Sequence, residues 1–155
     1  MGLFGFGKNK EQKAAEYILR RVDFHLRDMF SHPSIGDCIS SMEEKNAVEE
    51  YCGAAMINHM VNCLMSHGNP VDIYLEVSLR LSSRVRSLIE ECAGKLDGEC
   101  DNEFELKNRS RENAIEFGKH GLEHNQSLLS GIACFLPGRL YAIEDDSKTV
   151  IDRFM

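Results

Sequence analysis

One pair of histidines in this sequence has the spacing of a metal-binding motif. His120 and His124 are four residues apart, and Glu116 precedes His120 by the same interval. Two imidazoles one turn apart on a helix can chelate zinc or another transition metal, and a carboxylate can add an oxygen ligand. On a helical wheel, however, His120 points away from the apolar face, which is centred near Gly118 and Asn125. The spacing is therefore compatible with a metal site and also with a solvated pair, which we favour.

A second candidate metal site combines His59 and Cys63. These two residues are also one helical turn apart, so both side chains could hold one ion. A tetrahedral site would need a further ligand from another helix, for instance His124. The alternative, which we favour, is a core histidine hydrogen-bonded to a buried polar group such as Asn58 or Asn62 of a neighbour.

The six residues from Arg27 to His32, Arg-Asp-Met-Phe-Ser-His, carry a third set of reactive side chains. They resemble the R-polar-x-x-x-H motif of the HEPN family of small helical ribonucleases, with Asp28 in the polar position. The resemblance implies a dimer in which the arginine and histidine of both protomers act on an RNA phosphodiester without a metal. His32 would exchange the proton of a 2′-hydroxyl, and Arg27 would hold the charge of the pentacoordinate phosphate. Otherwise, His32 simply ends a helix, where its charge favours the helix dipole.

Acidic residues predominate in this chain. It has 25 Asp and Glu against 18 Lys and Arg, which gives a formal charge of −7. This balance disfavours nonspecific nucleic-acid binding, which depends on a basic surface. We expect a basic protein partner instead, because opposite charges promote association. The candidate contacts are four clustered glutamates, Glu43, Glu44, Glu49 and Glu50.

Length and composition indicate one globular domain. The chain has 155 residues, of which 43% are apolar and 28% charged. No stretch approaches the roughly 18 apolar residues that a membrane span needs, and the start lacks the features of a secretory signal. We therefore expect a soluble, cytoplasmic protein. Its six cysteines, which form no C-x-x-C motif, are expected to be reduced and mostly buried.

Apolar residues recurring every three or four positions predict four long helices. Ser40 and Ser41, three residues before Glu43 and Glu44, have the spacing of a capping box at the start of the second helix. This second helix is apolar around most of its circumference, so we expect it at the centre. The third helix is expected to bury Leu81 in its core stripe, which Leu75 and Leu79 widen. The four helices cover about residues 9–31, 41–66, 70–93 and 102–135.

The two ends of the chain are less regular. Residues 1–8 are rich in glycine and predict a flexible arm, which leaves residues 9–155 as a single helical domain. Near the other end, Pro137-Gly138 is typical of a type II turn. This turn would lead either to a hairpin or, as we favour, to a short helix from about residue 145. The predicted fold is thus an all-α single-domain bundle of four long helices with a short C-terminal helix or hairpin.

Three classes of function are compatible with such a bundle. The first, which we favour, is a non-enzymatic protein that binds another protein, as an inhibitor, immunity protein or regulatory adaptor does. The second is a HEPN-like ribonuclease that uses Arg27 and His32, and the third is a metal- or cofactor-binding bundle. We expect no bound cofactor. We also expect homo-oligomers, because the second helix has more apolar circumference than one bundle face would cover.

The reduced state of the cysteines can be tested by thiol titration. Under denaturant, the protein should show six free thiols, because no oxidising compartment is indicated. In the native protein, Cys52 and Cys63 should react slowly because they lie on the central helix. Three disulfides in protein purified without an oxidant would contradict both the predicted compartment and the predicted core.

Overall fold

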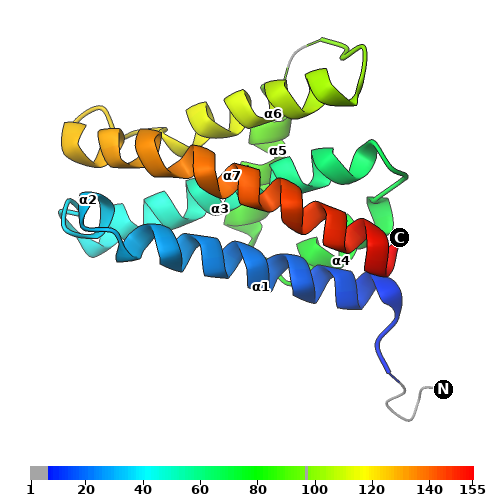
Figure 1. Cartoon of the computed structure of the whole chain (residues 1–155). Helices are drawn as coiled ribbons and strands as arrows, with labels where there is room; N and C mark the ends of the chain where they lie inside the picture. The colour runs from blue at the N-terminus through cyan, green and yellow to red at the C-terminus, as the bar shows by residue number, and fades with distance from the viewer. Residues whose placement is uncertain (1–6, 97) are drawn as a thin grey trace.

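Helices form nearly all of the regular structure. The computed structural model describes residues 7–96 and 98–155, and within these residues the chain forms seven α-helices and no β-strand (Figure 1). In chain order the helices are α1 (Lys10–Ser31), α2 (Pro33–Gly36), α3 (Met42–Met65), α4 (Val71–Leu79), α5 (Ser83–Gly94), α6 (Glu103–Gly118) and α7 (Gln126–Phe154). The prediction of an all-α single domain is confirmed. Most of the predicted N-terminal arm, residues 1–6, lies outside the described residues.

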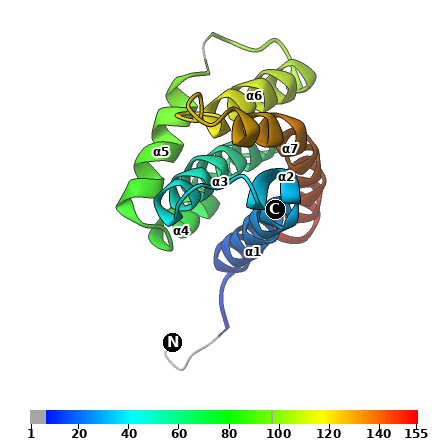
Figure 2. The same cartoon turned by 90° about the vertical axis from the view of Figure 1, so that its left-hand side faces the viewer.

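The four long helices α1, α3, α6 and α7 alternate in direction along the bundle (Figure 1). Helix α3 contacts α1, α5, α6 and α7, which confirms its predicted central position. The short helices α4 and α5 lie on one side of the bundle (Figure 2), where α4 packs against α1 and α5 against α3. None of the helices in the described part of the chain combines the length and apolar character needed to cross a membrane.

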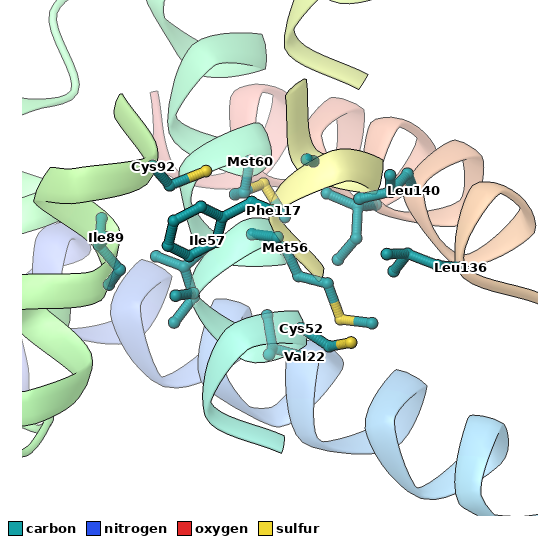
Figure 3. Close-up of a cluster of buried hydrophobic side chains, with 14 of the residues drawn as sticks. Val22, Cys52, Met56, Ile57, Met60, Ile89, Cys92, Phe117, Leu136 and Leu140 are labelled. Carbon is teal, nitrogen blue, oxygen red and sulfur yellow. The ribbon is translucent and has the colours of Figure 1, made fainter. Parts of the chain in front are cut away.

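The apolar core lies between α3 and the helices around it. Met56 and Met60 of α3 are fully buried, and side chains from α1, α5, α6 and α7 meet around them (Figure 3). Burial raises the pKa of the Cys52 and Cys63 thiols to about 12 and that of Cys92 to about 11, so these groups are protonated at neutral pH. All six cysteines are free: Cys52, Cys63 and Cys92 are buried, Cys38 and Cys100 half-buried, and Cys134 exposed.

The prediction of one continuous helix over residues 70–93 is wrong, because α4 ends at Leu79 and α5 begins at Ser83. Ser82 caps α5: its Oγ accepts a hydrogen bond from the backbone N–H three residues later at 3.2 Å. The Arg86 guanidinium donates to the Leu81 carbonyl oxygen at 3.2 Å and so supplies a partner to a backbone acceptor in the turn. Leu81 is therefore a partly buried turn residue and not part of a helical core stripe.

The predicted fourth helix, residues 102–135, is also interrupted. Helix α6 ends at Gly118, and α7 begins at Gln126 after a turn. Gly121 has a φ of +77°, in the left-handed region that favours glycine, so the chain can reverse there. Asn125 then caps α7, because its Oδ1 accepts a hydrogen bond from the Leu128 amide at 3.2 Å.

The prediction of a short C-terminal helix or hairpin is wrong as well. Helix α7 continues through Pro137 to Phe154, although a proline inside a helix costs about 3 kcal/mol. Leu136, Leu140 and Ile143 lie on one face of α7 and are fully buried. Burying each such side chain contributes about 1.5–3 kcal/mol, so together they outweigh the cost of the proline.

Close packing of α2 on α7 depends on a glycine. A Cβ atom at Gly131 would collide with the carbonyl oxygen of Ser34 and would lie 3.0 Å from Ile35 Cγ1. Seven residues further along α7, a Cβ atom at Gly138 would meet nothing within 4 Å. The two glycines thus share a helix and differ in their surroundings.

This contrast gives a paired prediction. Gly131→Ala should lower the free energy of unfolding by about 1–3 kcal/mol, because backbone atoms must shift. Gly138→Ala should raise it by up to about 1 kcal/mol, because alanine favours a helix and finds open space. Urea denaturation of both variants checks the signs. A change of the same sign in both would contradict the packing of α2 on α7.

Candidate functional site

His59 is fully buried at the centre of the bundle, where it joins three helices. Its Nδ1 is 2.8 Å from Ser110 Oγ on α6, and its Nε2 is 3.0 Å from Glu144 Oε2 on α7. Cys63 Sγ lies 3.9 Å from the same Nε2. His59 thus has the hydrogen-bonded environment favoured from the sequence, but its partners come from other helices and include a carboxylate.

Both ring nitrogens of His59 have a polar partner. Asn62 Nδ2 donates to Ser110 Oγ at 2.9 Å, Ser110 Oγ is hydrogen-bonded to His59 Nδ1, and His59 Nε2–H donates to the Glu144 carboxylate. Serine, histidine and glutamate are the residue types of a hydrolytic triad. Here, however, Ser110 and His59 are both fully buried, so a substrate cannot reach the serine hydroxyl. These side chains hydrogen-bond to one another and stabilise the core.

Arg111 balances the charge of Glu144. Its Nε and Nη2 each lie 2.7 Å from a different oxygen of the carboxylate, and its guanidinium covers the Tyr141 ring at 4.1 Å from the centroid. Burial alone raises the pKa of Glu144, but the hydrogen bonds from His59 and Arg111 outweigh burial and lower the pKa to about 2. Glu144 is therefore ionised at neutral pH.

A second buried network, between α1 and α7, was missed in the sequence. His25 Nε2 is 2.8 Å from Asp146 Oδ2, and Arg21 Nε is 3.1 Å from the other oxygen of Asp146. Arg139 approaches His25 Nδ1 at 3.5 Å. A signal was present, because His25 follows Val22 by three residues and thus lies on the apolar face of α1. A histidine on such a face needs a buried partner.

The structure does not bring Arg27 and His32 together within one chain. The Arg27 side chain is 80% exposed and lies 2.8 Å from Asp23, one turn earlier on α1. Asp28 pairs with Arg139 at 2.8 Å. The His32 ring stacks on Phe135 of α7, with ring centroids 4.1 Å apart. The predicted catalytic residues therefore contact different groups.

In contrast, the structure does bring together residues from two other predicted sites. Glu43, Glu44, His120 and His124 all line a groove of about 420 Å³ between the start of α3 and the turn before α7. His124 Nε2 is 3.0 Å from Glu44 Oε2, while His120 stacks on Tyr51 with centroids 4.8 Å apart. In the described part of the chain, no three His, Cys, Asp or Glu side chains are grouped so that they could hold a metal. Both histidines lie in a turn, so they do not have the geometry assumed from a continuous helix.

Glu44 is buried, and its carboxylate links the start of α3 to the loop that precedes it and to the turn before α7. Its Oε1 accepts hydrogen bonds from the Ser40 amide and hydroxyl, both at 2.8 Å, and from Asn125 Nδ2 at 3.0 Å. These bonds, with the one from Ser40 N–H as the largest cause, lower the pKa of Glu44. Of the other predicted partner contacts, Glu43 is exposed, while Glu49 and Glu50 are half-buried. The four glutamates therefore do not form one exposed cluster.

The outer face of α4 carries aliphatic side chains into solvent. Val71, Leu75 and Leu79 are 54%, 55% and 75% exposed, and their spacing of four residues aligns them on one side of the helix. The opposite side of α4 buries Ile73 and Val77. Sequence periodicity assigned Leu75 and Leu79 to a widened core stripe, and the structure corrects this assignment. We call Val71, Leu75 and Leu79 the α4 apolar stripe.

A small acidic cavity adjoins this stripe. It has a volume of about 320 Å³ and lies between the start of α1 and α4. Three carboxylate residues, Glu11, Asp72 and Glu76, line it together with Asn9 and Leu75. Leu75 thus belongs to both features, so one continuous surface offers apolar and acidic groups to a ligand.

Comparisons with known protein families, with curated proteins and with solved structures give no match to this chain. The resemblance to the HEPN ribonucleases therefore rests on the six residues from Arg27 to His32. The candidate site must be judged by its own geometry. On that basis, the α4 apolar stripe and the adjoining acidic cavity form the candidate protein-binding surface.

The Glu144 network makes a prediction about acid stability. The pKa of Glu144 is lower in the folded protein than its ordinary value of 4.5, so its ionised form stabilises the fold above pH 4.5. At pH 7, Glu144→Gln should lower the free energy of unfolding by roughly 3 kcal/mol. This difference from the wild type should narrow as the pH falls from 4.5 towards 2.

Urea denaturation at pH 7 and pH 3 measures this difference. Glu112→Gln is the matched control, because Glu112 is exposed on α6 beside Arg111. The control variant should follow the wild type at both pH values. A Glu144→Gln penalty that stays the same at pH 7 and pH 3 would contradict the role assigned to the ionised carboxylate.

Proposed function

We propose that this chain acts without catalysis, by binding another protein through the α4 apolar stripe. The observation that carries the proposal is the exposure of Val71, Leu75 and Leu79 along one side of a helix whose other side is buried. Grooves and helices that recognise one another commonly use apolar anchors at such helical intervals. The exposed stripe provides three anchors of this kind.

Energetics favour a partner on this face. Water contact with an aliphatic side chain is unfavourable, and burying a Val or Leu contributes about 1.5–3 kcal/mol. Helix α4 already contributes Ile73 and Val77 to the core, so its fold does not require outward-facing leucines. Contiguous apolar groups on a surface are a common mark of an interaction site. An inhibitor, an immunity protein and a regulatory adaptor would each use such a surface.

The buried networks also support a binding role over an enzymatic one. Ser110 and His59 are closed to substrate, and Arg27 and His32 contact different groups. Metal-independent RNA cleavage that disappears in His32→Ala would nevertheless contradict this proposal. We expect RNA to stay intact when it is incubated with the protein in EDTA.

A comparison of two exposed apolar positions tests the proposal. Leu79 on α4 and Phe104 on α6 are both 75% exposed, so serine at either position should leave the unfolding midpoint nearly unchanged. Leu79→Ser should weaken binding of the native partner by tenfold or more, because at least about 1.4 kcal/mol of apolar contact is lost. Phe104→Ser is the matched control and should bind like the wild type.

The measurement is affinity capture from cells that naturally produce the protein, with wild type and both variants compared by quantitative mass spectrometry. The proposal predicts a partner that is retained by wild type and Phe104→Ser and depleted at least tenfold by Leu79→Ser. The proposal would be contradicted if the wild type and both variants captured the same proteins in the same amounts. A partner that is lost only with Phe104→Ser would also contradict it.

A further inference from the structure

We infer that the partner carries a lysine or arginine beside its apolar anchor, and that this cation enters the acidic cavity next to Leu75. The inference rests on the proposed function and specifies the chemistry of the partner. The occupant is therefore an amphipathic segment with both apolar and basic groups. It would cover the α4 apolar stripe and place its basic group between Glu11 and Asp72.

Charge around the cavity is incompletely balanced. Glu76 is paired with Arg80 on the same helix, at 2.9 Å. Among residues 7–96 and 98–155, by contrast, no cationic group lies within 4.0 Å of Glu11 or Asp72. Lys10 is exposed and lines a neighbouring cavity with both of these acids, without reaching ion-pair distance. The two carboxylates can therefore receive a cation from outside the chain.

Asn9 caps α1 at the edge of the cavity. Its Oδ1 accepts a hydrogen bond from the Gln12 backbone N–H at 2.8 Å, and its backbone N–H donates to Gln12 Oε1 at 3.1 Å. This capping box fixes the start of α1 and holds Glu11 beside α4. The α1 side of the cavity therefore has a defined position in the protein without a partner.

Leu75 explains why a basic side chain with an aliphatic stem fits. Lysine and arginine bury their methylene groups on apolar surface while their charged ends remain near polar groups. Here, the stem would lie on Leu75 and the charged end would reach Glu11 and Asp72, since all three residues line one cavity. The net charge of −7 also attracts a basic partner at longer range.

A second copy of this chain fits the same surface poorly. At 100° per residue, Asp72 and Glu76 lie on one flank of the α4 apolar stripe, whereas Tyr74 and Ser78 lie on the other. A two-fold contact between antiparallel α4 helices would bring the acidic flank of one copy against the acidic flank of the other. Like charges would then oppose each other at the interface. For this antiparallel contact, charge complementarity therefore favours a basic partner over a second copy.

Two designed helical peptides provide a direct test. Both carry leucine at positions i, i+4 and i+8, and one has lysines beside this row where the other has glutamates. Binding to the full-length protein is measured by fluorescence anisotropy over a range of NaCl concentrations. The lysine peptide should bind wild type about 3–10-fold more tightly than the glutamate peptide at low salt, and this preference should shrink as salt rises.

Protein variants locate the source of the preference. Glu11→Gln combined with Asp72→Asn should remove most of the preference for lysine, while Glu90→Gln, an exposed acid on α5, should leave it intact. Leu79→Ser should weaken the binding of both peptides. Thermal unfolding of each variant confirms that it is folded.

The possible outcomes separate this inference from the proposed function. If both peptides bind wild type equally and Leu79→Ser weakens both, the inferred basic partner is wrong and the apolar docking surface stands. If neither peptide binds, or if binding survives Leu79→Ser, the proposed function itself is contradicted. Sedimentation of the protein alone tests the remaining occupant, because a dimer abolished by Leu79→Ser would overturn the inference in favour of a second copy.

Discussion

The alignment of the bundle depends on a half-buried carboxylate that needs partners from two other helices. Glu144 of α7 accepts hydrogen bonds from His59 of α3 and Arg111 of α6, and an ionised carboxylate without them would be costly beside the core. Apolar burial supplies most of the favourable free energy but is not directional. The hydrogen bonds to Glu144 have fixed geometry, so they set the position of α7 relative to α3 and α6.

Helix α7 uses a second carboxylate in the same way on its other side. Asp146 is two residues after Glu144, so the two side chains point about 200° apart and reach different neighbours. Asp146 contacts His25 and Arg21 of α1, while Glu144 contacts α3 and α6. Together these contacts hold α7 against α1 on one side and against α3 and α6 on the other.

The same networks occupy many of the polar side chains that could otherwise act at a functional site. Histidine, serine, arginine and glutamate side chains that could perform catalysis are used inside the bundle to satisfy one another. What remains at the surface of α4 is an apolar stripe beside two carboxylates that form no ion pair within 4.0 Å among the described residues. Such a combination is suited to recognition of another molecule, since apolar contact provides affinity and charge provides selectivity.

Local spacing alone predicts the helical class and several helix starts, because these depend on side chains within three or four residues of one another. Asn9, Ser41 and Asn102 each cap a helix near the predicted position. Local spacing does not determine which apolar residues are buried, and it wrongly places Leu75 and Leu79 in the core. It also favoured a turn at Pro137, where burial of Leu136 and Leu140 stabilises a continuous helix. Burial depends on the helices that pack against a residue, so the exposed face of α4 and the partners of Glu144 follow from tertiary packing.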